Sequence, residues 1–286
     1  MSAPRRVTVA ASQPRTFRGK DEPANLECAL AAIAEAARAG AQIICFPEGY
    51  PGPYSGSLTF QPLPDLCRAA RQNGMHVVCG GLEPATADAF YNMLYLLGPE
   101  GDVRATYRRC QPAPEAVDRV LFGRRVQPGG APQVVETPAG RLGLLVCSEI
   151  FSPELSRLLA LQGADIVFAP VGGMIYELFE SWKVLVCARA IENHVYVVVC
   201  QNLYGMERGV GTIAGPEGVL AERRDAGLLV AELDLERLDW LRTHEETLAL
   251  PKPYRTIPGL LAWRRPEVYG PLAETGRAGP PGAGDP

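Results

Sequence analysis

The sequence predicts a mixed α/β protein built as a four-layer α-β-β-α sandwich. Apolar strand-like segments alternate with helical segments along most of the chain. Hairpin signals interrupt this alternation at intervals, as in the Pro-Glu-Gly-Asp turn at 99–102. Strands that pair both through helices and through hairpins favour two sheets with helices on their outer faces. The length of 286 residues suits a single large α/β domain.

The first half of the chain alternates strands and helices and ends in a hairpin. An alanine-rich periodicity that stops at Gly40 indicates the first helix, and Asn-Gly closes the second. The expected elements are a strand over 6–12, a helix over 23–40, a strand over 41–48, a helix over 63–74, a strand over 75–83 and a hairpin over 90–109.

The second half repeats this pattern. Ser152 and Pro153 indicate a helix start, since serine is a good N-cap and proline suits the first turn. The expected elements are strands over 140–147, 164–170 and 195–202, helices over 152–163 and 176–194, a hairpin over 209–222 and a strand running into a helix over 227–242. We find no internal linker, so we expect one domain over 1–270, followed by a disordered Gly/Pro-rich tail over 271–286.

Charge and cysteine usage exclude several classes of protein. The net charge is −4 and charged residues are spread along the chain, so we expect neither a nucleic-acid partner nor a membrane surface. The N-terminal apolar stretch is too short for a secretory signal, and no run approaches the ~20 residues of a membrane span. The eight cysteines form no Cys-x-x-Cys pair and have no histidines at zinc spacing. We therefore expect no metal site and a reducing, cytoplasmic location.

Polar groups suited to catalysis follow three of the expected strands. Glu48 follows one strand in a Pro/Gly/Tyr-rich loop, and Arg108 and Arg109 end another. Adjacent strand residues face opposite ways, so one arginine is expected to enter a cleft. Cys147 ends a third strand just before a helix, where backbone N–H groups beside the sulfur would form an oxyanion hole. Taken singly, each group has a favoured structural alternative. Glu48 would be an exposed loop residue, the two arginines a solvated charged edge, and Cys147 a core residue.

Together and in this order, the three groups resemble the Glu-Lys-Cys arrangement of the nitrilase superfamily, the carbon–nitrogen hydrolases. The resemblance covers about residues 7–269 and rests on the segments "FPEGYPG" (46–52), "YNMLYLLGPEG" (91–101), "TYRR" (106–109), "VCSEIFSPELSRLLALQGADIVFAP" (146–170), "WKVLVCARAIENHVYVVVCQN" (182–202), "GTIAGPEGVL" (211–220) and "RRPEVY" (264–269).

The resemblance implies an α-β-β-α sandwich of the carbon–nitrogen hydrolase type that cleaves a non-peptide C–N bond through a thioester on Cys147. Glu48 would take the thiol proton and later activate water. The backbone N–H of Ser148 and a cationic side chain would hold the oxyanion. The family uses no metal or organic cofactor and forms homodimers or larger homo-oligomers, with part of the interface expected from the helix after the nucleophile and from 263–269.

Two departures from the family pattern concern charged residues. Arg109 stands where the family has lysine, after Tyr107 and Arg108. Arginine stays charged and offers a flat fork of donors, so Arg109 would depress the Cys147 pKa and stabilise an oxyanion but not protonate a leaving amine. The family's second acidic residue corresponds to Asp118 or to Glu115, and the sequence leaves this choice open.

The leading hypothesis is a hydrolase of a small amide, ω-amide or N-carbamoyl compound. "CSEIFSPE" (147–154) lacks the tryptophan that follows the nucleophile in true nitrilases. The alternatives are a nitrilase acting on a small nitrile, and a non-hydrolysing small-molecule-binding relative, because the catalytic cation is altered. The expected pocket lining is Tyr54, Glu149, Phe151 and the turn with Gly172 and Gly173. Glu149 either binds a substrate ammonium group or is a buried acid held by backbone or arginine.

Overall fold

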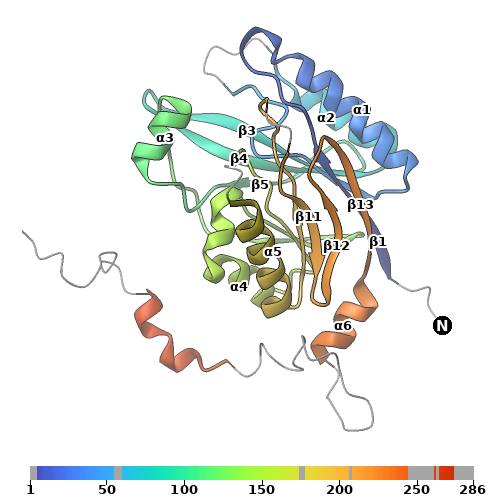
Figure 1. Cartoon of the computed structure of the whole chain (residues 1–286), viewed down its shortest axis with the longest axis vertical. Coiled ribbons are helices and arrows are strands. Elements are labelled where there is room, and N and C mark those ends of the chain that lie inside the picture. The colour runs from blue at the N-terminus through green and yellow to red at the C-terminus, as the bar shows by residue number, and fades with distance from the viewer. Residues whose placement is uncertain are drawn as a thin grey trace, which may run out of the picture.

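A computed structural model describes residues 5–54, 60–173, 178–205, 208–243, 261 and 264–273 (Figure 1). The side chains of 120–122 and 271 are not described.

The first sheet is seven-stranded and runs β13-β1-β2-β3-β4-β5, with β6 paired to β4. Its centre, β1-β2-β3, is parallel, whereas β13 and the β3-β4-β5 meander are antiparallel. The strands are β1 Arg6–Gln13, β2 Ile43–Cys45, β3 His76–Thr86, β4 Ala89–Leu97, β5 Val103–Arg108, β6 Arg125–Val126 and β13 Gly227–Asp234.

The second sheet is six-stranded and runs β12-β11-β10-β9-β8-β7. Its centre, β8-β9-β10, is parallel, and the strands on either side pair antiparallel. The strands are β7 Val134–Thr137, β8 Gly140–Leu144, β9 Ile166–Phe168, β10 Tyr196–Val199, β11 Gly211–Gly215 and β12 Gly218–Arg223.

Helices lie against the outer face of each sheet (Figure 1). The α-helices are α1 Ala24–Arg38, α2 Leu63–Asn73, α3 Glu115–Phe122, α4 Pro153–Leu161, α5 Phe179–Asn193 and α6 Leu235–Thr243, and the short 3-10 turns are η1 Gly19–Asp21, η2 Cys147–Phe151, η4 Pro266–Val268 and η5 Gly270–Ala273.

Three apolar clusters separate the four layers. One lies between the sheets and includes Ile43 and Phe168. A second joins α1 and α2 to the first sheet through residues such as Ile44, and a third joins α4 and α5 to the second sheet through residues such as Val167. Successive strand residues face opposite ways, so apolar runs such as 43–45 and 166–168 fill the clusters on both faces of their sheet. The expected four-layer α-β-β-α architecture is confirmed.

Four of the expected strands are shorter than the sequence suggested: β2, β8, β9 and β10. β2 stops at Cys45, because Pro47 has no N–H to continue the ladder. β8 stops at Leu144, and Cys147 begins the turn η2 with a left-handed φ of 52° instead of ending the strand. The prediction that Cys147 is a strand residue was therefore wrong.

Several short elements were not expected. The sequence analysis treated 112–123 as a source of acidic residues, but α3 lies there, and β6, β7 and η1 were also missed. Residues 271–273, expected in the tail, belong to η5, and 274–286 lie outside the described residues. Among the helices that the structure describes, none is long and apolar enough to cross a membrane.

Candidate active site

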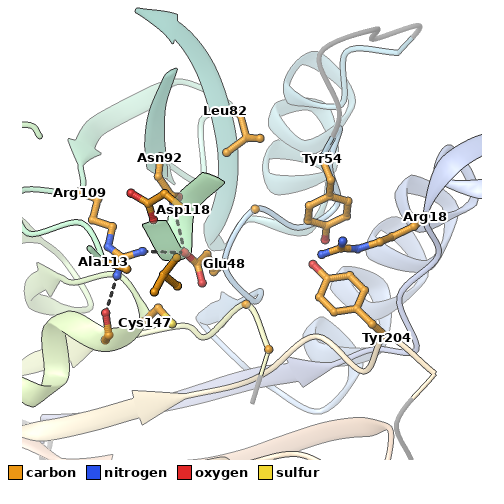
Figure 2. Close-up of a pocket in the computed structure, with 15 residues that line it drawn as sticks. Arg18, Glu48, Tyr54, Leu82, Asn92, Arg109, Ala113, Asp118, Cys147 and Tyr204 are labelled. Atoms are coloured by element: carbon orange, nitrogen blue, oxygen red, sulfur yellow. Dashed lines mark hydrogen bonds and ion pairs between the residues drawn. The ribbon is translucent and has the colours of Figure 1, made fainter. Parts of the chain in front are cut away.

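The ends of strands from both sheets meet at one cavity of about 280 Å³ (Figure 2). Glu48 follows β2, Arg109 follows β5, Cys147 follows β8 and Gly172 follows β9. Three of these strands belong to the parallel centres of the two sheets, whose carboxyl ends commonly carry ligand sites. The structure thus brings together the three side chains that the sequence singled out for chemistry.

Cys147 stands at a sharp turn between β8 and α4. Its φ of 52° is unusual for a residue with a side chain, and such conformations cluster at functional sites. The Cys147 N–H donates to the carbonyl oxygen of Pro170 at 2.9 Å, which anchors the turn to the end of β9. Because the first amides of a helical turn have no partner inside it, the Ser148 N–H is suited to hold an oxyanion.

Glu48 is only 8% exposed and is held from several sides. Its Oε1 accepts hydrogen bonds from Asn92 Nδ2 at 2.6 Å and Arg109 Nη1 at 3.3 Å. Its backbone carbonyl accepts one from Asn202 Nδ2 at 2.7 Å. A Cβ on Gly172 would lie 2.4 Å from Glu48 Oε2, so only glycine leaves room for this carboxylate.

Arg109 is 3% exposed and uses all three nitrogens of its guanidinium. Nη1 donates to Glu48, Nη2 donates to Ser148 Oγ at 2.5 Å, and Nε donates to the carbonyl oxygen of Gln111 at 3.2 Å. Burial disfavours its charge, but Glu48 and the other acidic groups nearby outweigh burial and raise the Arg109 pKa. Arg109 is therefore a fixed cation that cannot donate a proton in the reaction.

Arg108 lies on the opposite face of the strand, as expected. Its guanidinium is 3.4 Å from Glu83 and stacks 4.3 Å from the ring centroid of Tyr91. It does not line the cavity.

The Cys147 thiol carries its proton in this site. Burial and the neighbouring charge of Glu48 raise its pKa to about 12, against the opposing effects of Arg109 and the Gly172 N–H. Arg109 lowers the Cys147 pKa, as expected, but the increase caused by burial and by Glu48 is larger. A thiol with so high a pKa needs a neighbouring base before its sulfur can attack, and the Glu48 carboxylate lies in the same cavity.

The structure distinguishes the two candidates for the second acidic residue. Asp118 lies on α3, is buried and lines the cavity. Burial raises the pKa of this carboxyl, although the Val126 N–H and Arg109 oppose the shift. Glu115, one turn earlier, is exposed and pairs with Arg119 at 2.8 Å. Asp118 is thus the acid that reaches the site.

Glu149 and Phe151 do not line the cavity, contrary to expectation. Glu149 is 0% exposed, and its carboxylate accepts hydrogen bonds from the Tyr107 hydroxyl and from the backbone N–H groups of Val146, Cys110 and Gln111. It is a buried acid that ties the end of β5 to the turn at Cys147. Phe151 is 47% exposed and packs edge-on against Trp182.

The opposite side of the cavity contains two residues that the sequence analysis missed. Tyr54 and Gly173 line the cavity as expected, but Arg18 and Tyr204 join them there. Figure 2 shows Arg18 reaching between the two tyrosines on one side of Glu48, while Asn92, Arg109 and Asp118 lie on the other. Arg18 lies in the loop after β1, far along the chain from the recognised motifs, so no sequence signal pointed to it.

Two asparagines that orient Glu48 were also missed. Asn92 and Asn202 both lie in segments that carried the family resemblance. Asn92 lies within the apolar strand β4 and Asn202 just after β10, and such polar amides in apolar surroundings are the signal that could have identified them. Among the described residues, no group of three or more His, Cys, Asp or Glu side chains is placed to hold a metal ion.

Comparisons with known proteins agree with this geometry. The family model described as carbon-nitrogen hydrolase matches residues 8–243. The mouse (Mus musculus) deaminated glutathione amidase is 30% identical over 92% of this chain and 85% of its own length. The chloroplastic omega-amidase of Arabidopsis thaliana is 26% identical over 78% of this chain and 67% of its own length.

Solved amidase structures share the fold. An amidase from Nesterenkonia sp. superimposes with a TM-score of 0.71 at 26% identity, covering 84% of this chain and 94% of that one. A mutant of the amidase from Nesterenkonia sp. AN1 shows covalent addition of the acetamide moiety of fluoroacetamide at its active-site cysteine. That structure has a TM-score of 0.70 at 26% identity and covers 82% of this chain and 92% of its own.

Proposed function

This chain belongs to the carbon–nitrogen hydrolase family and is an amide-hydrolysing enzyme, and we propose that Cys147 is its nucleophile and Glu48 its general base. The observation that carries this assignment is the position of the Glu48 carboxylate, which shares one buried cavity with the Cys147 thiol and is fixed by Asn92 and Arg109.

In the first half-reaction, Glu48 takes the thiol proton as sulfur attacks the amide carbonyl. The carbonyl π electrons move to oxygen, and the oxyanion is held by the Ser148 N–H and the charge of Arg109. When the intermediate collapses, the C–N bond breaks, and Glu48 returns the proton to the leaving nitrogen. Because Arg109 keeps its protons, Glu48 carries this transfer alone, and the enzyme is left as a thioester on Cys147.

In the second half-reaction, Glu48 removes a proton from a water molecule that attacks the thioester carbonyl. The C–S bond breaks, the carboxylic acid is released, and the proton returns to the Cys147 sulfur. Asp118 faces the same cavity, where burial raises the pKa of its carboxyl and the charge of Arg109 opposes that rise.

A small amide, ω-amide or N-carbamoyl compound suits this site. The cavity of about 280 Å³ is near the lower limit of small-molecule pockets. The named relatives include an omega-amidase and deaminated glutathione amidases, which supports the ω-amide class. The position of Arg109 argues against a non-hydrolysing binding protein, because Arg109 contacts both Glu48 and Ser148.

We further propose a homodimer or larger homo-oligomer of a single domain over 1–270, in a reducing cytoplasm. Exposed apolar side chains on the outer helices, such as Leu161 on α4 and Val184 on α5, support self-association. Eight free cysteines support a reducing compartment.

Ammonia release from a panel of small amides, N-carbamoyl amino acids and nitriles tests the function. Wild-type protein should turn over members of the amide or carbamoyl groups, and mass spectrometry should trap an acyl adduct on Cys147. Turnover of nitriles alone, or an adduct on another residue, would contradict the proposal.

A further inference from the structure

Arg18 is a second cation of the cavity, and it is not used by the groups assigned to the reaction. Its guanidinium carbon lies 4.0 Å from the ring centroid of Tyr204 and 5.6 Å from that of Tyr54. The two rings meet edge to face at 5.6 Å. Such stacking orients an arginine while leaving the edge of its guanidinium available for hydrogen bonds.

The tyrosines are themselves fixed in place. Tyr54 donates from its hydroxyl to Asn202 Oδ1 at 3.1 Å, and its backbone N–H donates to Glu22. Burial raises the pKa of Tyr204 to about 12, and hydrogen bonds with Arg18 and Tyr54 oppose the rise. Both hydroxyls therefore stay protonated, and the two rings that contact Arg18 are neutral.

The two arginines of the cavity differ in how their charge is balanced. Arg109 is paired with Glu48, whereas no carboxylate among the described residues lies within ion-pair distance of Arg18. The charge of Glu22, whose Oε1 accepts the Tyr54 N–H, interacts with that of Arg18 from beyond ion-pair distance. The Arg18 guanidinium is thus available at the mouth of the cavity to the part of a substrate that extends away from the reacting amide.

We propose that Arg18, Tyr54 and Tyr204 form a carboxylate-binding subsite, which selects amides whose far end is an anionic carboxylate. This inference rests on the proposed function, because it places the scissile amide at Cys147. A guanidinium binds carboxylates through parallel N–H donors, and the apolar Leu82 and Val117 of the same cavity suit the methylene chain between the two ends.

A pair of substrates of the same shape tests the subsite. Succinamate carries a carboxylate, and levulinamide replaces it with a neutral methyl ketone. Wild-type kcat/KM should be about tenfold or more higher for succinamate than for levulinamide, because a hydrogen bond to a charged group strengthens binding by about that factor. Gamma-aminobutyramide, which carries an ammonium group, should be the poorest of the three. The preference for succinamate should shrink with added salt, because Arg18 is exposed.

Variants at Arg18 separate binding from folding. In Arg18→Gln the preference for succinamate should be lost, mainly through KM, and Arg18→Lys should retain part of it. Arg15→Ala is the matched control: it removes an exposed arginine from the same segment that does not line the cavity, and the preference should survive.

The outcomes distinguish the two proposals. If wild-type protein hydrolyses levulinamide as well as succinamate, or if Arg18→Gln lowers both equally, the carboxylate subsite is wrong while the amidase stands. If no amide of any charge releases ammonia, the proposed function itself fails.

Discussion

At the inner end of the cavity, Glu48 and Arg109 are buried and hydrogen-bonded to each other and to Asn92 and Ser148, whereas at the mouth Arg18 is exposed and oriented mainly by tyrosine rings. A buried polar group left unsatisfied costs about 1–3 kcal/mol, so each inner residue depends on the others. Exposed contacts are weaker and more nearly independent. Changes at the inner end should therefore have large, non-additive effects on the reaction, and changes at the mouth should have small effects on selectivity.

The largest effect is expected for Cys147→Ala. Loss of the proposed nucleophile removes the thioester route, so ammonia release should fall to background, while the thermal unfolding midpoint changes little. Cys187→Ala is the control, because Cys187 lies on α5 outside the cavity and should leave turnover intact. Appreciable activity in Cys147→Ala would remove the basis for calling the inner end catalytic.

Glu48→Gln should lower kcat by about 10² or more, the usual range for a general base. The same change should lower the Cys147 pKa, because the charge of Glu48 and its hydrogen bond both raise it. Iodoacetamide labelling measured against pH should therefore shift to lower pH even as turnover falls. Glu83→Gln, which alters a half-buried acid paired with Arg108 outside the cavity, should change neither quantity.

Arg109→Ala should lower kcat/KM by about 10², in line with the loss of one oxyanion donor. Its effect on the thiol should have the opposite sign to that of Glu48→Gln, because Arg109 lowers the Cys147 pKa. Below a pKa of about 12 the thiolate fraction changes about tenfold per pH unit, so labelling at fixed pH should slow. Arg108→Ala should leave both measurements unchanged.

Arg109→Lys tests whether the inner end is rebuilt around a guanidinium. Lysine has one nitrogen and cannot make the three separate contacts of Arg109 to Glu48, Ser148 and Gln111. We expect a loss of activity intermediate between wild type and Arg109→Ala in steady-state assays. Activity above wild type would instead identify Arg109 as a weakened version of the family's lysine.

The sequence predicted the inner end better than the mouth for a physical reason. Glu48, Arg109 and Cys147 each follow an apolar strand, and the meeting of strand ends at one edge is a consequence of the fold class. The choice between Asp118 and Glu115 needed coordinates, because only packing shows that one is buried and the other exposed. Glu149 was misplaced because a buried acid and a substrate-binding acid look alike in sequence.

The mouth is assembled from separate loops, so no local pattern marks it. Arg18 and Tyr204 lie in loops after β1 and β10, and their stacking joins segments nearly two hundred residues apart. The boundaries of β2 and β8 were missed for a related reason. The apolar runs continue past the strand ends, while Pro47 and the left-handed Cys147 change the backbone course.

The smallest expected effect is at Tyr204, and it sharpens the comparison between the two ends. A cation–π contact at an exposed site contributes about 0.5–1 kcal/mol, which corresponds to a change of about two- to fivefold. Tyr204→Leu removes the ring beside Arg18 and should reduce the preference for succinamate over levulinamide by that factor, whereas Tyr204→Phe keeps the ring and should retain most of the preference. Neither change touches Glu48 or Arg109, so the pH dependence of Cys147 labelling should stay as in the wild type. If Tyr204→Leu shifted that labelling profile as much as Glu48→Gln does, the mouth and the inner end would be one coupled network, and the division between chemistry and selectivity would have to be abandoned.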